Sequence, residues 1–268
     1  MDSSSHDNMS FLEHLEELRW HIIRSLIAVI SAGFICFLMK DFIFDTIIFG
    51  PKKMDFPTYK FLCQAATFIG VETTFCGDEF PFIVQNRTMS GQFSAHVMTS
   101  IISGFIISFP YILYEFWKFI APGLLEKEKA KSRGFILVSS LLFFLGVLFG
   151  YYIISPLSIN FLGTYQVSSQ VLNEIDLGSF ISLVRSSTLA SGVIFELPII
   201  IYFLTKAGVV TPESLVKYRK YALVLVLILA AIITPPDVAS QIIVAIPIVV
   251  LYQVSIFISK IVIKNQAK

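Results

Sequence analysis

Long apolar segments constrain the fold of this chain more than any other feature of its sequence. Six of them lie near 21–40, 94–120, 134–156, 178–206, 220–234 and 238–259. Inside a bilayer every backbone polar group must be bonded within the protein, so only helices and closed barrels cross it. The sequence lacks the alternating ten-residue segments of a barrel. We therefore expect an all-α, polytopic membrane protein with six transmembrane helices.

Composition supports a membrane protein and argues against several other classes. Of the 268 residues, 55% are hydrophobic and 15% are charged, whereas soluble domains carry about a quarter charged residues. The sequence has no Gly-rich phosphate loop, metal-ligand spacing or nucleophile elbow. We therefore predict neither an enzyme nor a bound cofactor or metal. The net charge of +1 gives no reason to expect nucleic acid.

The basic residues between the apolar segments predict the topology. They follow the second, fourth and sixth segments, as Lys127, Lys129, Lys131, Arg133, Lys206, Lys217, Arg219, Lys220, Lys260, Lys264 and Lys268. No Lys or Arg follows the third or the fifth segment. Because basic loops stay in the cytoplasm, we expect both termini there. The outer loop 41–93 also holds Lys and Arg, but long loops follow this rule poorly.

The last two segments are predicted to be short. From Tyr221 to Thr234 a helix covers about 21 Å, and a typical hydrocarbon core is about 30 Å thick. The turn 235–237 then leads directly into the segment 238–259. Either the bilayer thins around this pair of helices or other protein shelters them.

Prolines and small residues predict how the helices bend and pack. Pro110, Pro198 and Pro247 lie inside predicted helices and should kink them, which favours a curved, concave wall. Small residues recur every four positions in the second and third segments, a spacing that lets helix backbones approach closely in lipid. They are Ser100, Gly104, Ser108, Gly146 and Gly150. We assign these small residues to packing.

Glu196 lies deep in the fourth segment. A carboxylate at that depth is costly and normally faces protein or water. Pro198 has no N–H to bond the carbonyl of Ile194, so this carbonyl and the Glu196 side chain can form a small polar pocket. Arg185 lies three helical turns earlier on nearly the same face, too far away for direct contact. The functional interpretation is an intramembrane site for a polar group on a partner helix; the structural one is a buried, protonated carboxylate.

The segment 1–20 is predicted to be a cytoplasmic amphipathic helix with an acidic face. Three carboxylates crowd the entrance to the first apolar segment, where Lys and Arg are usual. They are Glu13, Glu16 and Glu17. Acid at this surface suits arginine, which can bond a carboxylate through two parallel hydrogen bonds. Glu126 and Glu128 form a second acidic pair in the next cytoplasmic loop. Together they favour a shared cation site, with a solvated acidic face as the structural alternative.

Two of the three cysteines, Cys63 and Cys76, fall in the long outer loop. An oxidising outer compartment permits a bridge between them, and closing so short a loop would stabilise the protein by about 3 kcal/mol. Two free thiols are the alternative. Cys36 lies in the first apolar segment and is held in lipid.

Several short motifs resemble the TatC family, the core subunits of the twin-arginine protein translocase. They are HLEELR at 14–19, FIAPGL at 119–124, Glu128, FELP at 195–198, TPPDV at 234–238 and Gln241. Their order along six predicted spans makes the match specific. It covers nearly the whole chain and implies a single TatC-like membrane domain, 1–268, in the cytoplasmic (inner) membrane of a bacterium.

The resemblance implies a receptor for signal peptides that carry an Arg-Arg pair. Folded cargo would cross the membrane driven by the proton-motive force, without a bound nucleotide or other cofactor. Glu17 and Glu128 would bind the arginines, with support from Phe119 and Arg19. Glu196 would face the surface that holds the signal peptide or a partner helix. The residues expected to dock the single-span subunits TatA and TatB, within an oligomeric receptor complex, are Thr234, Asp237 and Gln241.

Two other functions fit parts of the sequence. An ion-coupled secondary transporter would use Glu196 as its proton or cation site, but the sequence shows neither an internal repeat nor the paired broken helices of many transporters. A passive assembly scaffold would not need the acidic entrance. The chain also departs from the family pattern: its first outer loop is long and carries the cysteine pair, and Arg185 stands where an apolar residue is expected.

Overall fold

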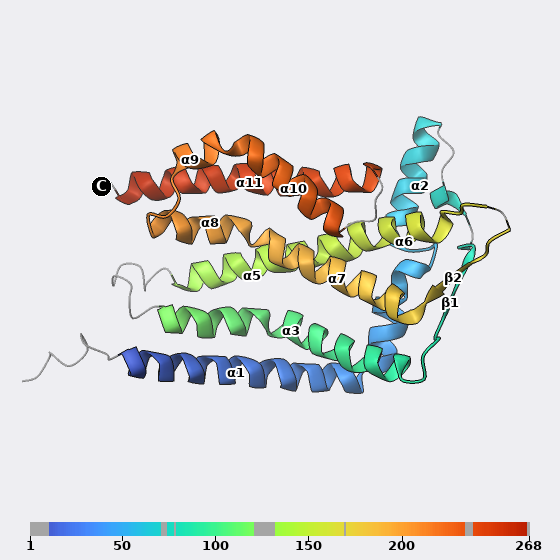
Figure 1. Ribbon diagram of the computed structural model, residues 1–268, viewed down its shortest axis with the longest axis horizontal. Coiled ribbons are helices and arrows are strands. Elements are labelled where there is room, and N and C mark those ends of the chain that lie inside the picture. Colours follow the sequence, from blue (N-terminus) through green and yellow to red (C-terminus); the bar gives the residue numbers. More distant parts are fainter. Residues whose placement is uncertain are drawn as a thin grey trace, which may run out of the picture. The chain divides into compact units, whose positions relative to one another are not determined.

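The structure is a computed structural model, and most of the residues that it describes are helical (Figure 1). It describes residues 11–70, 74–77, 79–120, 132–168, 170–233 and 238–266. The chain forms two compact units, residues 1–40 with 96–140 and residues 41–95 with 141–268. The boundaries fall inside two helices, α3 and α5, so each of these helices contributes to both units.

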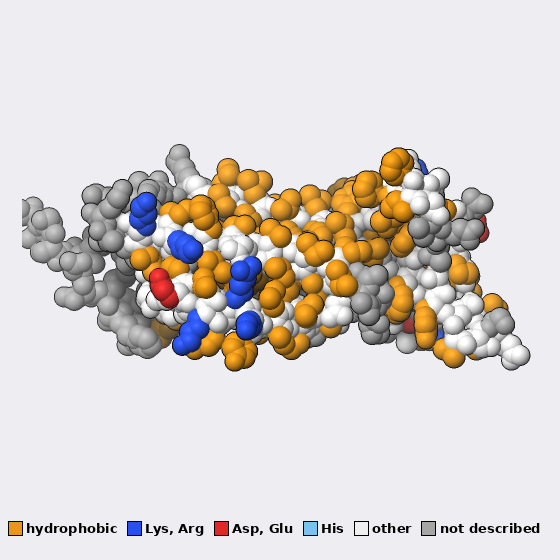
Figure 2. Space-filling model, turned by 90° about the horizontal axis from the view of Figure 1, so that it is seen from above, with side chains coloured by type: hydrophobic (Ala, Val, Ile, Leu, Met, Phe, Trp, Pro, Cys, Tyr) orange, Lys and Arg blue, Asp and Glu red, His pale blue; other side chains and the backbone are white. Residues whose placement is uncertain are grey.

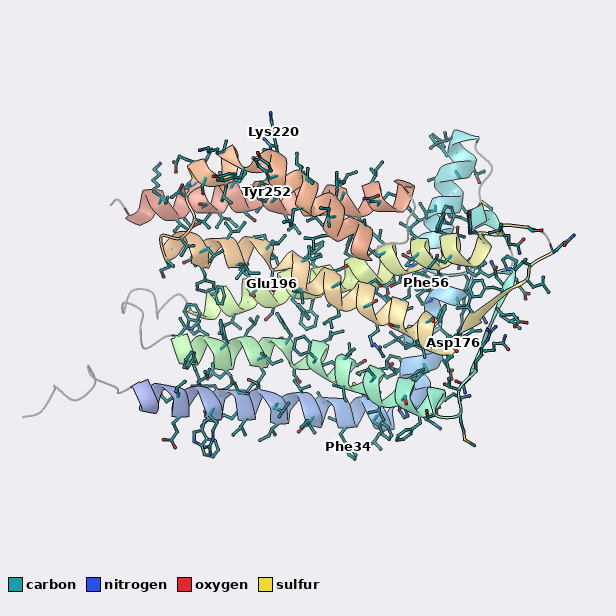
Figure 3. All side chains as sticks on the ribbon, viewed as in Figure 1. Phe34, Phe56, Asp176, Glu196, Lys220 and Tyr252 are labelled. Atoms are coloured by element: carbon teal, nitrogen blue, oxygen red, sulfur yellow. A yellow bond between two sulfur atoms is a disulfide. The ribbon has the colours of Figure 1, made fainter. Side chains whose placement is uncertain are left out.

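Among the described residues, five helical segments are long and apolar enough to cross a membrane. They are Leu15–Leu38, Gly91–Ile120, Gly134–Thr164, Leu177–Lys206 and Gln241–Lys264. Many of their exposed side chains are large and apolar, such as Phe34, Leu141 and Phe257; Phe34 projects away from its helix (Figure 3). Figure 2 shows a face that is mostly hydrophobic, with Lys and Arg gathered toward one end. Apolar surface on this scale marks contact with lipid, and the predicted all-helical, polytopic membrane fold is confirmed.

Close approach of two helix backbones holds the first unit together. The unit contains α1 (Phe11–Leu38) and most of α3 (Gly91–Ile120). A Cβ atom at Gly104 would lie 2.5 Å from the backbone nitrogen of Gly33, so a larger residue would force the helices apart. Ser108 Oγ donates to the Ala28 carbonyl at 3.0 Å. The predicted packing through small residues of the second segment is confirmed.

The second unit packs the third membrane-spanning segment against α7 (Leu177–Phe195). That segment consists of α5 (Ser132–Phe149), the π-helical turn η5 (Gly150–Ile154) and α6 (Ser155–Thr164). A Cβ atom at Gly146 would lie 2.5 Å from the Ser191 carbonyl oxygen, and one at Gly150 2.6 Å from that of Ser187. Both glycines are therefore needed where α7 approaches, as the four-residue spacing predicted.

Four helices form the C-terminal part of the second unit. They are α8 (Leu197–Lys206), α9 (Pro212–Lys217), α10 (Arg219–Ile233) and α11 (Val238–Gln266). Thr205 Oγ1 on α8 donates to Ser259 Oγ on α11 at 2.9 Å. Val226 of α10 and Val244 of α11 are buried together in one apolar cluster. Burial of apolar side chains and a satisfied hydroxyl pair thus fix α11 against both neighbours.

The last two helices differ in length. α10 has 15 residues, as expected of a short fifth helix, and does not count among the five spans above. α11 has 29 residues, so the prediction of a short sixth helix is wrong. The apolar residues Ile261, Val262 and Ile263 continue the helix past the predicted end at 259. Lys260 does not stop it, because a lysine can extend its charged end along the helix toward water.

The region 41–93 was predicted as a long outer loop, but much of it has regular structure. Its elements are η1 (Phe42–Ile48), η2 (Gly50–Lys52), α2 (Pro57–Ile69), η3 (Thr74–Cys76) and β1 (Phe82–Gln85). Gly70, with φ of 76°, ends α2 in the left-handed conformation. The buried Tyr59 hydroxyl lies 2.8 Å from the Pro51 carbonyl and 3.0 Å from that of Pro156. Burial raises the pKa of this phenol, so it stays a neutral donor that holds α2 against α6.

Two short strands join the first and second outer regions. β1 pairs in parallel with β2 (Asn173–Asp176), and the sequence did not predict either strand, because four residues are too few for a clear alternation. Gly163 leaves room for the ring of Phe82. Asp176 then begins α7 (Figure 3) by accepting hydrogen bonds from the N–H groups of Gly178 and Ser179.

Candidate functional site

A buried carboxylate lies between α1 and α3 in the first unit. Glu115, on α3, is only 2% exposed. His21 Nδ1, on α1, lies 2.6 Å from Glu115 Oε2, the distance of a strong, charge-assisted hydrogen bond. Arg24, also on α1, places a guanidinium nitrogen 3.8 Å from the same oxygen, with its side chain half exposed. α1 thus supplies the donors that a buried carboxylate on α3 requires.

Phe119 lies one helical turn beyond Glu115 and contacts the same histidine. The ring centroids of Phe119 and His21 are 6.2 Å apart, with the rings edge to face, a geometry that aromatic pairs favour. His21 therefore contacts two residues of α3 that are four positions apart, which places both on one face of that helix.

Glu17 lies one turn before His21 on α1 and is exposed. The four-residue spacing places Glu17 and His21 on one face of α1, so the structure brings the helical turns of Glu17 and Phe119 together. Arg19 is also exposed, and its guanidinium carbon lies 5.7 Å from the ring centroid of Trp20. Glu128, the second acid predicted for this site, lies outside the described residues.

Glu115, His21 and Arg24 were not predicted as site residues from the sequence. A signal was available for Glu115, because it is a carboxylate inside a predicted span, where charges usually have a function. His21 offered no comparable signal. Its partner lies 94 positions away along the chain, and only the packing of α1 against α3 identifies it.

Glu196 lies at the junction of α7 and α8 (Figure 3) and is 8% exposed. Its N–H bonds to the Val193 carbonyl at 3.1 Å, and its own carbonyl accepts from the N–H of Ile200 at 3.0 Å. The tighter turn at this point reflects Pro198, which has no N–H for the carbonyl of Ile194. The helix is interrupted here, as the sequence predicted.

Arg185 is the other residue of the predicted intramembrane site, and Pro110 and Pro247 are the other prolines inside predicted helices. Arg185 is half buried on α7, eleven positions before Glu196, which along a helix is about three turns. α3 continues as a helix through Pro110, and α11 through Pro247.

Of the three predicted docking residues, Gln241 lies among the described residues. Gln241, near the start of α11, donates from Nε2 to the Leu227 carbonyl of α10 at 3.1 Å. This bond ties α10 to α11 at the end where the chain turns between them. Thr234 and Asp237 lie outside the described residues.

In the outer region the structure joins Cys63 and Cys76 in a disulfide across 13 positions, with their Cα atoms 5.1 Å apart. That separation suits a disulfide, and the bond ties α2 to η3. The remaining cysteine, Cys36, is a buried free thiol on α1.

Comparison with known proteins gives a consistent result. The family of the Sec-independent protein translocase protein (TatC) matches residues 13–247. A TatC protein of Blattabacterium sp. subsp. Periplaneta americana is 48% identical over 94% of this chain and 96% of its own length. The TatC protein of Aquifex aeolicus is 37% identical over 94% of this chain and 95% of its own length. A crystal structure described as the twin arginine translocase receptor TatC in DDM is 36% identical, with a TM-score of 0.70 over 91% of this chain and 98% of that chain.

The fold defines a multi-pass helical membrane protein. The chain belongs to the TatC family of Sec-independent protein translocase components. It is therefore a bacterial membrane transport protein of the twin-arginine system and not an enzyme, and the resemblance that its short motifs carried is confirmed.

Proposed function

We propose that this chain is the signal-peptide receptor and core of a translocase that exports folded proteins with twin-arginine signal peptides. The observation that carries the proposal is an exposed carboxylate on a helix, α1, that is fixed against α3. Glu17 is exposed, while His21, one turn further along α1, is bonded to the buried Glu115 of α3. Fixing the helix beforehand lowers the entropy lost when a flexible peptide binds.

The chemistry of this surface suits an arginine pair. A guanidinium group can bond a carboxylate such as Glu17 through two parallel hydrogen bonds. Glu128, in the predicted cytoplasmic loop after the second span, offers a second acid. The Phe119 ring gives a guanidinium group a face on which to stack. Arg19 is exposed two residues further along α1 and is assigned a supporting role.

Six crossings with both termini in the cytoplasm complete the proposed topology, with α10 as the fifth. The exposed apolar side chains of α10, such as Val224 and Ile228, suit a lipid or protein environment. Basic residues lie at the end of α8, on α9, at the start of α10 and near the end of α11, as Lys206, Lys217, Arg219 and Lys264. A 15-residue helix spans less than the hydrocarbon core, so the bilayer thins or partner helices cover it.

The partners in this proposal are the single-span subunits TatA and TatB, docked beside α10 and α11 in an oligomeric complex. The residues proposed for this docking are Thr234, Asp237 and Gln241. Glu196 would meet the signal peptide or a partner helix inside the membrane, because carboxylates within membrane spans usually have a function. The proton-motive force would drive transport of the folded cargo.

Binding of a fluorescent twin-arginine signal peptide to the purified full-length protein tests the proposal. Glu17→Ala and Glu128→Ala should each weaken binding by about tenfold, the equivalent of about 1.4 kcal/mol, and rising salt should weaken wild-type binding because the contact is ionic. Glu213→Ala, which removes an exposed acid on α9, controls for net charge. Unchanged affinity in the Glu17/Glu128 double variant would contradict the site.

A further inference from the structure

We infer that His21 and Glu115 are positioning residues that hold the twin-arginine site in its binding geometry. The inference rests on the proposed function, because it concerns the same site. Glu115 is 2% exposed and therefore closed to a signal peptide. It can act only through the residues one helical turn away, which the peptide does reach.

The spacing on both helices makes the pair a clamp. Glu17 and His21 are four positions apart on α1, and Glu115 and Phe119 are four positions apart on α3, so each pair shares one helix face. The 2.6 Å contact joins His21 to Glu115. Glu17 and Phe119, which carry the proposed peptide contacts, then lie on adjoining turns of the two helices.

The contact also fixes how α1 sits along α3. A slip of one residue moves a helix by about 1.5 Å and turns its side chains by about 100°, which would break a 2.6 Å bond and displace Glu17 from Phe119. The backbone contacts of Gly33 with Gly104, and of Ala28 with Ser108, lie deeper along the helices. Among the contacts described here, the polar clamp is the one nearest the end of α1 that carries Glu17.

The charges around the clamp explain why losing one partner is costly. Arg24 lies 3.8 Å from the same carboxylate oxygen but is half exposed, and exposed ion pairs contribute little. Tyr111 and Lys118, both on α3, also interact with Glu115, but they cannot tie α3 to another helix. His21 is therefore the close interhelical partner, and removing it breaks the short bond that joins the buried Glu115 to α1.

Two substitutions at His21 separate the hydrogen bond from the ring. His21→Phe keeps an aromatic ring beside Phe119 but has no donor, whereas His21→Asn places an amide N–H close to the position of Nδ1 but has no ring. We expect the Phe variant of the full-length protein to bind a twin-arginine peptide about tenfold more weakly. The Asn variant should keep affinity within about threefold of wild type. Ile22→Ala, at the exposed neighbouring position, controls for changes to α1.

A double-mutant cycle tests the partner. Glu115→Leu should weaken binding as His21→Phe does, and the double variant should bind no more weakly than either single one, because both changes break one bond. Thermal unfolding of each variant shows whether it is folded. If Glu115→Leu does not fold, the two His21 variants still decide the question, since both leave the carboxylate in place.

The outcomes separate this inference from the proposed function. Wild-type affinity in His21→Phe, with binding still lost in Glu17→Ala, would overturn the clamp and leave the receptor function intact. Equal losses in the Phe and Asn variants would also overturn it, because the effect would then come from packing. Wild-type affinity in the Glu17/Glu128 double variant would instead remove the proposed site itself.

Discussion

Glu196 is a carboxylate buried where the chain crosses the membrane, so its proton is the detail that matters most at the scale of a single residue. A carboxyl group can accept hydrogen bonds when charged and can both donate and accept when neutral. The surrounding backbone is already bonded, since the Glu196 N–H and carbonyl both have helical partners. Any added contact with a peptide or a partner helix would therefore be made through the side chain of Glu196.

We expect Glu196→Gln to retain most export of a folded reporter protein, and Glu196→Ala or Glu196→Leu to impair it. Gln keeps the shape and hydrogen bonding of Glu but cannot titrate. A hydrogen bond between helices in lipid contributes about 1 kcal/mol, so the Ala variant should export about fivefold less in a binding-limited assay. Export rates in the three variants, with equal amounts of protein in the membrane, measure this order.

An ion-coupled transporter predicts a different order, because its proton site must titrate. If Glu196→Gln abolished transport as completely as Glu196→Ala while the complex still assembled, the hydrogen-bonding role would be wrong.

Single residues could be predicted from the sequence where one feature stood out against its neighbours. Glu196 stood out because it interrupts an apolar segment, and Pro198 because it cannot continue a helix. His21 and Glu115 could not be paired in this way, because their contact depends on how α1 packs along α3. Gln241 was predicted to dock a partner, a role that stays a prediction, and its hydrogen bond to Leu227 was not foreseen.

At the scale of elements, the outer region depends on ties between short pieces of structure. α2 is held at its start by the buried Tyr59 and is joined to η3 by Cys63–Cys76. Its last turn exposes Phe68 almost fully, at 93%. Because the last turn of α2 buries so little surface, we expect its stability to depend on the Cys63–Cys76 disulfide.

We predict that the Cys63–Cys76 disulfide is formed in the native membrane and stabilises the outer region. Cys63→Ser, Cys76→Ser and the double variant should each lower stability by about 2–4 kcal/mol, with the double variant no worse than either single one. Mass spectrometry after alkylation, with and without reductant, detects the bridge. Free labelling of both thiols without reductant would contradict it, and Cys36 serves as the internal free thiol.

The close contact of α1 with α3 gives a second prediction at this scale. Gly104→Ala places a Cβ atom 2.5 Å from the Gly33 nitrogen, and overpacking of this kind costs about 1–3 kcal/mol. Gly134→Ala is the matched control, because a Cβ atom there meets nothing within 4 Å and alanine favours a helix by up to about 1 kcal/mol. Thermal unfolding in detergent should separate the two variants, and equal midpoints would contradict the close packing.

Elements could be predicted where lipid imposes the rule. Long apolar segments must be helical in a bilayer, so the sequence located the spans that contain α3, α7 and α11. The sequence did not reveal β1 and β2, because their pairing joins two outer regions far apart in the chain. The predicted last segment ended at 259, whereas the apolar residues after Lys260 continue the helix.

For the whole molecule, the number of membrane crossings depends on α10. Five segments are long enough by themselves, and α10, with 15 residues, decides whether there is a sixth crossing. The number also fixes the side of the C-terminus. If the N-terminus and the region between α8 and α10 are cytoplasmic, α11 ends in the cytoplasm only if α10 also crosses.

We predict six crossings, with the end of α11 in the cytoplasm, because Lys260 and Lys264 lie there and basic ends stay inside. Single cysteines at Val167, Val209 and Lys264, all exposed positions, can be labelled in intact cells with a membrane-impermeant thiol reagent. Val167→Cys, in the outer region before β2, should react from outside. Val209→Cys, between α8 and α9, should react only after the membrane is opened, and Lys264→Cys should behave like it. Reaction of Lys264→Cys from outside, with Val209→Cys still protected, would mean that α10 does not cross and that the chain has five spans.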